Sequence, residues 1–152
     1  ESNRIGVFGH GFTYSGHPVA AAVALKNLEL MEEWDVMGHA ARVSPTFQAR
    51  LNGLSDHPLV GEARGVGLVG AIELIADKSA RRNFQPTQGV GAYLSQCATD
   101  AGLIIRAMGD NIGLCPPLII TEAEINEMFD RLTSALNATE EWVDAGGLRT
   151  SN

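Results

Sequence analysis

The stretch Leu103–Cys115, LIIRAMGDNIGLC, sets two short apolar segments on either side of a polar turn. LIIRA and IGLC flank MGDN, and this pattern predicts an antiparallel β-hairpin. Further on, Thr121 is followed three positions later by Glu124, the spacing of a helix N-terminal capping box. An apolar stripe then recurs at helical spacing, at Ile125, Met128, Phe129, Leu132 and Leu136. We therefore expect a hairpin and then a helix to about Trp142, with a frayed end at residues 144–152.

Upstream of the hairpin, helical and extended patterns alternate. Pro18 suits the first turn of a helix expected from about Pro18 to Glu33, and Ser15 is a candidate cap. The further expected elements are a helix from about Asp35 to Leu51 with Val43 and Phe47 on its apolar face, extended segments at Leu59–Gly65 and Leu68–Ile75, and a helix that carries Val90, Leu94, Cys97 and Ala101 and ends at Gly102. This order predicts an α+β fold, a small antiparallel sheet covered by helices.

The segment Gly65–Gly70, GVGLVG, matches the G-x-G-x-x-G pattern of dinucleotide-binding loops. In that motif a helix begins at the third glycine, and an acidic residue about twenty positions further on binds the ribose. Here the strand-like run AIELIAD follows, and QGVGAYL provides no acid at the required distance. We therefore reject nucleotide binding and expect these glycines to permit a bulge or a close backbone approach in a sheet.

The composition is that of an ordinary globular protein. Of the 152 residues 45% are hydrophobic, and the net charge of -7 argues against nucleic acid or an anionic membrane as a partner. The longest apolar run, Pro18–Leu25, is shorter than the ~20 residues of a membrane span, and the opening ESNRIGVFGHG lacks the features of a signal peptide. Cys97 and Cys115 lie in apolar contexts without C-x-x-C spacing, which predicts buried, reduced thiols and a cytoplasmic location.

The segment His10–Leu25, HGFTYSGHPVAAAVAL, places a polar loop directly before an apolar helix. Gly11 and Gly16 free the backbone to turn its amides outward, and Thr13 and Ser15 add hydroxyl groups. Free amides, a hydroxyl and the positive end of a helix dipole together favour an anion. An ordinary capped helix uses the same residue types, so these features alone leave both interpretations open.

Two long blocks of this sequence resemble class III, or omega, aminotransferases, enzymes of fold type I that use pyridoxal 5'-phosphate. The blocks are FGHGFTYSGHPVAAAVALKNLELM, residues 8–31, and GLIIRAMGDNIGLCPPLIITEAEINEM, residues 102–128. The resemblance covers nearly all of the chain. It implies the C-terminal portion of a homodimeric enzyme that transfers an amino group from an amine to a 2-oxo acid such as pyruvate.

The resemblance also implies roles for three residues. In the family, the threonine of the HG-x-T segment reaches across the dimer interface and binds the cofactor phosphate of the neighbouring subunit. This role would fall to Thr13, with Phe12 facing the same cofactor through its backbone. The arginine of LIIRAMGD, Arg106, would bind the substrate carboxylate, for which a guanidinium offers a planar two-bond fork. Without the resemblance, Arg106 could equally be a charge that reaches solvent from the end of a strand.

The family's Schiff-base lysine is expected upstream of the HG-x-T segment, so no catalytic residue is expected within this chain. Lys26 and Lys78 are instead expected to be solvated surface residues. The four histidines show no metal-ligand spacing, and no metal site is expected. The implied organisation is a cofactor-phosphate loop at the end of the large domain, residues 1–17, connecting helices, 18–58, and a small C-terminal α+β domain, 59–152.

Two alternatives to a transaminase stay open at this point. Other class III enzymes that use pyridoxal phosphate, such as aminomutases and decarboxylases, share the scaffold, although the RAMGD setting of Arg106 favours a transaminase. The lack of a catalytic lysine also fits a non-catalytic α+β binding or dimerisation module. The intact HG-x-T block argues against such a module.

Overall fold

The computed structural model of the chain describes residues 2–6 and 11–149. The chain divides into two compact units, Glu1–Val36 and Met37–Asn152. The boundary falls within the range 18–58 that we expect to hold connecting helices. The division into a loop, connecting helices and a small domain stays a prediction.

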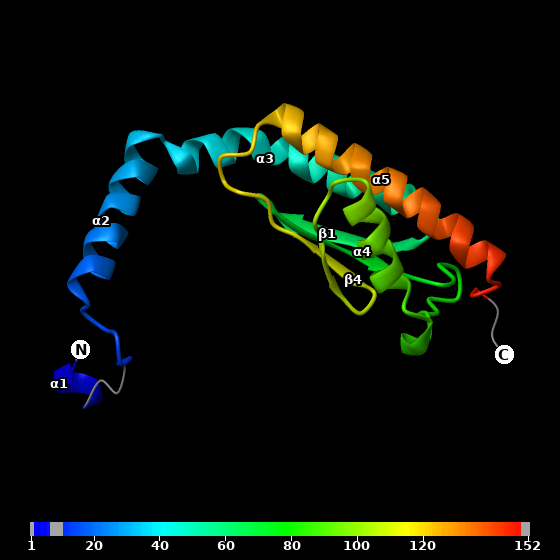
Figure 1. Cartoon of the computed structure of the whole chain (residues 1–152), viewed down its shortest axis with the longest axis horizontal. Coiled ribbons are helices and arrows are strands. Elements are labelled where there is room, and N and C mark those ends of the chain that lie inside the picture. The colour runs from blue at the N-terminus through cyan, green and yellow to red at the C-terminus, as the bar shows by residue number, and fades with distance from the viewer. Residues whose placement is uncertain (1, 7–10, 150–152) are drawn as a thin grey trace. The chain divides into compact units, whose positions relative to one another are not determined.

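The first unit contains the short helix α1 (Ser2–Ile5) and the longer helix α2 (Pro18–Glu33) (Figure 1). The predicted bounds of the longer helix are confirmed. Its cap is His17, whose Nδ1 accepts a hydrogen bond from the Ala20 amide at 3.4 Å. The prediction of Ser15 as the cap is wrong, because the Ser15 hydroxyl lies in the preceding turn and accepts a backbone amide there.

No side chain of α2 is buried. Its large apolar residues point in several directions around the axis, and four of them are exposed: Val19, Val23, Leu25 and Leu28. A helix of 16 residues is marginal in water when only its backbone stabilises it. Apolar side chains on several sides of a helix, as in the first half of α2, are typical of a buried position. We therefore expect other protein surfaces to cover α2 in the whole protein.

The elements that follow α2 confirm the predicted order. They are α3 (Val36–Gly53), β1 (Val60–Val66), β2 (Val69–Leu74), α4 (Val90–Asp100), β3 (Arg106–Met108), β4 (Asn111–Leu114) and α5 (Glu122–Ala145), with short 3₁₀ turns at Leu54–Asp56 and Pro86–Gln88. The expected hairpin around MGDN is formed by β3 and β4, although its first strand begins at Arg106 rather than at Leu103.

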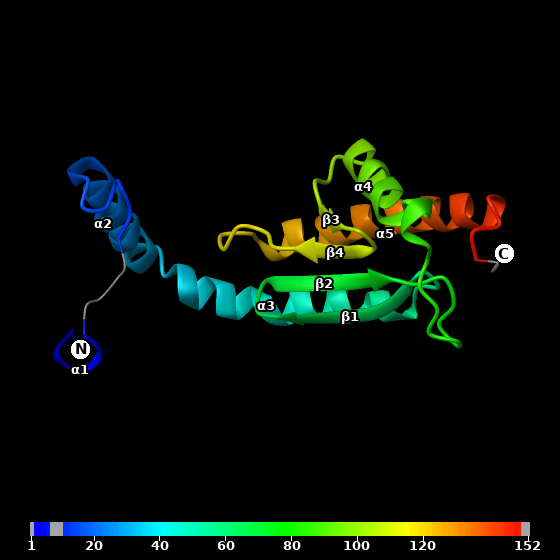
Figure 2. The ribbon, with the colours of Figure 1, turned by 90° about the horizontal axis from the view of Figure 1, so that it is seen from below.

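The four strands form one antiparallel sheet in the order β1-β2-β4-β3. Helices α3 and α5 lie along one face of this sheet (Figures 1 and 2). Helix α4 packs against α5 and beside the edge strand β3. The predicted α+β class, a small antiparallel sheet covered by helices, is confirmed.

The core lies between the sheet and these helices. Strand side chains alternate, so that Ile72 and Leu74 of β2 and Ile112 of β4 are fully buried on the helix side. The rings of Phe47 in α3 and Phe129 in α5 meet edge to face, with centroids 5.3 Å apart. The apolar stripes predicted for α3 and α5 are therefore the faces that the two helices bury.

The glycines of GVGLVG lie in the hairpin of β1 and β2, and no helix begins there. A Cβ atom at Gly65 would lie 2.6 Å from the Val69 carbonyl oxygen, and one at Gly70 would lie 2.6 Å from Leu51 Cδ2. Gly67, in the turn, has a φ of +59°. The helix that a dinucleotide-binding loop requires does not follow the third glycine. The predicted close approach at these glycines is confirmed.

The capping box at the start of α5 is formed as predicted. The Thr121 backbone amide and hydroxyl both donate to Glu124 Oε2 at 2.8 Å, and the Glu124 amide donates to Thr121 Oγ1 at 3.3 Å. The hydrogen bond from the Thr121 amide, and to a smaller extent the one from its hydroxyl, hold the pKa of Glu124 below its ordinary value. Burial has a smaller, opposing effect on this pKa.

Acid is expected to weaken the fold through this carboxylate. Because the pKa of Glu124 is lower in the folded state, its contribution to stability is fully present above the unfolded-state pKa and is lost as pH falls through the folded-state pKa. Urea unfolding midpoints measured across the acidic range should therefore fall less steeply in Glu124→Gln than in the wild type. The control is Glu122→Gln, which removes a charge from the same turn; an equally shallow profile in both variants would contradict the prediction.

The C-terminal segment is ordered further than expected. Arg149 forms ion pairs with Asp144 at 2.7 Å and with Glu140 at 3.2 Å, and its carbonyl accepts from the Arg82 guanidinium. The prediction of a frayed end is thus wrong for residues 144–149, and residues 150–152 lie outside those described. None of the described helices combines the length and apolar character that a membrane span requires.

Candidate functional site

The loop before α2 is built from two successive turns. The Ser15 amide donates to the Phe12 carbonyl at 2.9 Å, and the Phe12 amide donates to Ser15 Oγ at 2.9 Å. The His17 amide then donates to the Tyr14 carbonyl at 3.2 Å, and between them Gly16 has a φ of +74°. A positive φ at this third position of a turn favours glycine. These turns hold the loop at the N-terminal end of α2.

Thr13 lies at the exposed corner of the first turn, next to Phe12, a residue that is 72% exposed. Within residues 2–6 and 11–149, the Thr13 hydroxyl and amide form no hydrogen bond. A hydroxyl and an amide without a partner, in a loop that leads into a helix N-terminus, are donors of the kind that a phosphate accepts. The residues at this corner therefore fit the phosphate of a cofactor. His10, the first residue of the motif, lies outside the described residues.

Arg106 begins the edge strand β3 on the face of the sheet that points away from α3 and α5. Arg106 pairs with Gly113 of β4 in the ladder. Gly113 also pairs with Ala71 of β2, and Ala71 pairs with Arg64 of β1. Directly paired residues in an antiparallel sheet project on the same side. We call this side, which carries Arg64, Ala71, Gly113 and Arg106, the outer face of the sheet.

The two arginines of the outer face differ in their partners. Arg64 lies 3.2 Å from Glu62 and 3.9 Å from Glu73, and it donates to Asn111 Oδ1 at 3.3 Å. The guanidinium of Arg106 forms no hydrogen bond or ion pair within the part of the chain that the structure describes. Arg106 is therefore the arginine of this row that is available to an added carboxylate.

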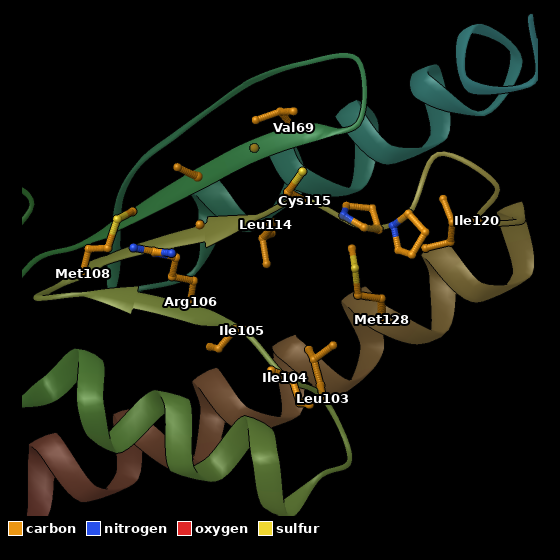
Figure 3. A pocket seen from close by; sticks show the side chains of 15 residues that line it. Val69, Leu103, Ile104, Ile105, Arg106, Met108, Leu114, Cys115, Ile120 and Met128 are labelled. Atoms are coloured by element: carbon orange, nitrogen blue, oxygen red, sulfur yellow. The ribbon is translucent and has the colours of Figure 1, made fainter. Parts of the chain in front are cut away.

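A groove of about 720 Å³ lies beside Arg106, and its lining extends from the outer face to Ile120 and to Met128 of α5. Figure 3 shows the side chains of Arg106 and Met108, both from β3, at one end of the groove. Cys115 and Ile120 lie further along it. The lining is apolar apart from Arg106 and Cys115: Val69, Ala71, Leu103, Ile104, Ile105, Met108, Leu114, Pro116, Pro117, Ile120 and Met128, with Gly70 and Gly113. Such a groove suits a ligand with one carboxylate and an apolar part.

The prediction that both cysteines are buried is wrong for Cys115, which is exposed, while Cys97 is half-buried. The cause is strand alternation: Ile112 and Leu114 point into the core, so Gly113 and Cys115 point to the outer face. The sequence patterns did not predict Gly113 and Cys115 as groove residues. The inward spacing of Ile112 and Leu114 is the signal that could have identified them.

The two lysines lie on the surface, as predicted. Lys26 is exposed and pairs with Glu29 at 3.1 Å, and exposed Lys78 donates to the Ser55 carbonyl at 2.7 Å. Among the described residues, no group of histidine, cysteine and acidic side chains could hold a metal ion. Phe12 and Thr13 thus share one turn of the first unit, and Arg106 lies on a strand of the second.

Comparison with known proteins defines the family. Residues 2–136 match the family model described as aminotransferase class III. Gamma aminobutyrate transaminase 1, mitochondrial, of Solanum lycopersicum is 42% identical over 144 residues, which are 95% of this chain and 28% of that protein. The putrescine–pyruvate aminotransferase of Pseudomonas aeruginosa is 46% identical over 138 residues, which are 90% of this chain and 30% of that protein.

Solved structures give the same result. A structure described as a transaminase with L-Ala matches with a TM-score of 0.84 and 46% identity, over 93% of this chain and 34% of that one. The PMP-bound form of an aminotransferase from Vibrio fluvialis matches with a TM-score of 0.83 and 38% identity, over 92% of this chain and 31% of that one. The chain belongs to the class III aminotransferase family, with the fold of the matching part of fold type I transaminases. It spans about a third or less of the length of these relatives.

Proposed function

We propose that this chain is the C-terminal part of an enzyme that uses pyridoxal phosphate to transfer an amino group from an amine to a 2-oxo acid such as pyruvate. Membership of the class III aminotransferase family supports the reaction type. The name of the Pseudomonas aeruginosa relative supports an amine donor and pyruvate as acceptor. The lysine that holds the cofactor would lie in the part of the enzyme outside this chain, because Lys26 and Lys78 are committed to surface contacts.

Thr13 is proposed to bind the cofactor phosphate of the partner subunit in a homodimer, and Phe12 to face the same cofactor through its backbone. The support is the hydroxyl and amide of Thr13, which have no hydrogen-bond partner among the described residues and lie at the corner of a turn that precedes α2. The cofactor, when bound, supplies the electron sink for removing a proton from the carbon that bears the amino group. Thr13 and its turn contribute positioning, by holding the phosphate end.

Arg106 is proposed to bind the carboxylate of the 2-oxo acid. The single observation that carries this proposal is its guanidinium, which has no partner among residues 2–6 and 11–149 and lies beside an apolar groove, while Arg64 of the same row is neutralised by glutamates. A guanidinium forms two parallel hydrogen bonds with a carboxylate and so fixes its orientation. The apolar lining excludes water around the pair, which strengthens the interaction.

Removal of the Thr13 hydroxyl is expected to weaken cofactor retention in the full-length enzyme. A hydrogen bond to a charged group contributes about 1.5 to 3 kcal/mol, so Thr13→Ala should raise the dissociation constant for pyridoxal phosphate at least about tenfold. The measurement is equilibrium dialysis followed by the absorbance of the bound cofactor. Thr13→Ser keeps the hydroxyl and serves as the control. Unchanged cofactor affinity in Thr13→Ala would contradict the proposal that Thr13 binds the cofactor phosphate.

Product analysis of the full-length enzyme tests the reaction class. A transaminase converts an amine and pyruvate into a carbonyl compound and alanine, and both half-reactions are needed for turnover. An aminomutase would leave the amino group on the same carbon skeleton, and a decarboxylase would release carbon dioxide. A dimerisation module would bind no cofactor. Alanine formed from pyruvate only when amine donor and cofactor are both supplied would support the proposal.

A further inference from the structure

Gly113 is a strand glycine that the fold itself does not require. At the other glycines of the described strands a Cβ atom would collide: 2.9 Å from Ile75 Cβ at Gly61, and 2.6 Å from its nearest neighbour at both Gly65 and Gly70. A Cβ at Gly113 would meet only Met108 Cε at 3.6 Å and the Arg106 carbonyl oxygen at 3.8 Å, which are ordinary contacts. Nor does Gly113 have a positive φ. Alanine would therefore fit here without strain.

Glycine is an unfavourable choice at such a position. It loses more conformational freedom on folding than alanine does, and it contributes no side chain to cross-strand packing. Since neither sterics nor backbone conformation calls for glycine at this point of β4, its benefit lies in the space that it leaves free. That space is on the outer face of the sheet, within the lining of the groove.

The free space lies directly beside Arg106. Gly113 is the ladder partner of Arg106, and on its other side it pairs with Ala71, another small residue that lines the groove. Side chains of directly paired residues stand about 5 Å apart at Cβ. A side chain at position 113 would therefore occupy the volume next to the aliphatic part of Arg106. A bound anion and the guanidinium would have to share that volume.

We propose that Gly113 is a positioning residue for the acceptor: by having no side chain, it keeps open the space in which Arg106 and the carboxylate of a 2-oxo acid pair. The inference rests on the proposed function of Arg106 and adds to it the residue that makes the pairing sterically possible. Acceptors that lack a carboxylate do not need this space. Gly113 thus contributes to the preference for 2-oxo acids over uncharged carbonyl compounds.

The test uses Gly113→Ala and Gly113→Val in the full-length enzyme with one amine donor and two acceptors of equal chain length, pyruvate and propanal. Gly113→Ala should raise KM for pyruvate about tenfold, and Gly113→Val should raise it further, because a pocket that is one methyl group too small costs roughly 10-fold or more. KM for propanal should change by less than about twofold, and the melting temperature should be unchanged or raised. Gly53→Ala, where no atom lies within 4 Å of the added Cβ, is the matched control.

Three results would overturn the inference. Unchanged KM for pyruvate in both variants would mean that the space is not used. Equal losses for pyruvate and propanal would point to a general effect on the fold or the cofactor, and a lowered melting temperature would show that another protein segment fills the space. These failures differ from failure of the proposed function, which would appear as the absence of any selective effect when Arg106 itself is replaced.

Discussion

Replacing Arg106 by alanine in the full-length enzyme is expected to lower kcat/KM for pyruvate about 100-fold or more, and to change kcat/KM for propanal by less than about threefold. The guanidinium has no partner within the described residues. Its removal therefore breaks no hydrogen bond or ion pair among them. What is lost is the pair of charged hydrogen bonds to the acceptor carboxylate, each of which contributes about 1.5 to 3 kcal/mol. Steady-state kinetics with the two acceptors measure the difference.

Two further arginine variants sharpen this test. Arg106→Lys keeps the positive charge without the planar fork, so it should recover only part of the loss for pyruvate. Arg64→Ala removes an arginine from the same row of the outer face, but one that Glu62 and Glu73 already neutralise. It should affect both acceptors alike and weakly. Equal losses for pyruvate and propanal in Arg106→Ala would indicate that Arg106 supports the fold rather than the carboxylate.

Replacing Gly91 by alanine is expected to be the most destabilising methyl addition in the second unit. Gly91 lies in the first turn of α4, where its amide donates to Asp110 Oδ1 at 3.0 Å, and a Cβ atom there would lie 1.9 Å from the Gly109 carbonyl oxygen. The obstructing atoms belong to the backbone of the β3–β4 turn, so the helix and hairpin must separate. Overpacking costs of 1 to 3 kcal/mol are typical, and we expect about 3 kcal/mol here. Urea denaturation followed by circular dichroism measures the loss.

Gly53→Ala makes the same chemical change in open space and should have the opposite sign. Gly53 has a φ of -60° and a ψ of -25° at the end of α3, and no atom lies within 4 Å of an added Cβ. Alanine at such a position restricts the unfolded chain and should stabilise by about 0.4 to 1 kcal/mol. If Gly91→Ala were as stable as the wild type, the close contact between α4 and the turn would not exist in solution.

The regular elements could be predicted because local signals and tertiary structure agree. The Pro18 start, the capping box of Thr121 and Glu124, and the apolar stripe of α5 each depend on residues within one helix. Long-range contacts could not be predicted in the same way. Arg149 orders the C-terminal turn through Glu140 and Asp144, and its carbonyl accepts from Arg82, more than sixty positions away in the sequence.

The candidate site was predictable only in part. Thr13 and Arg106 could be named from the resemblance. That Arg64 has glutamate partners while Arg106 has none among the described residues could not be predicted, because it depends on the sheet register. The exposed Cys115 was misjudged since an apolar neighbourhood in sequence does not fix which face of a strand a residue occupies. That a Cβ atom would fit at Gly113 depends on its distances to atoms of Arg106 and Met108 in the neighbouring strand β3. The sequence of β4 alone does not reveal these distances.

The exposed apolar surface of α2 bears on the loop that carries Thr13. The hydrogen bonds of this loop include two short-range turns that lead into the start of α2. A helix of 16 residues is marginal in water when only its backbone stabilises it, so we expect the loop to keep its shape best when a neighbouring surface shelters α2. If Thr13 binds the coenzyme as proposed, capture of the coenzyme and burial of this helix would favour each other.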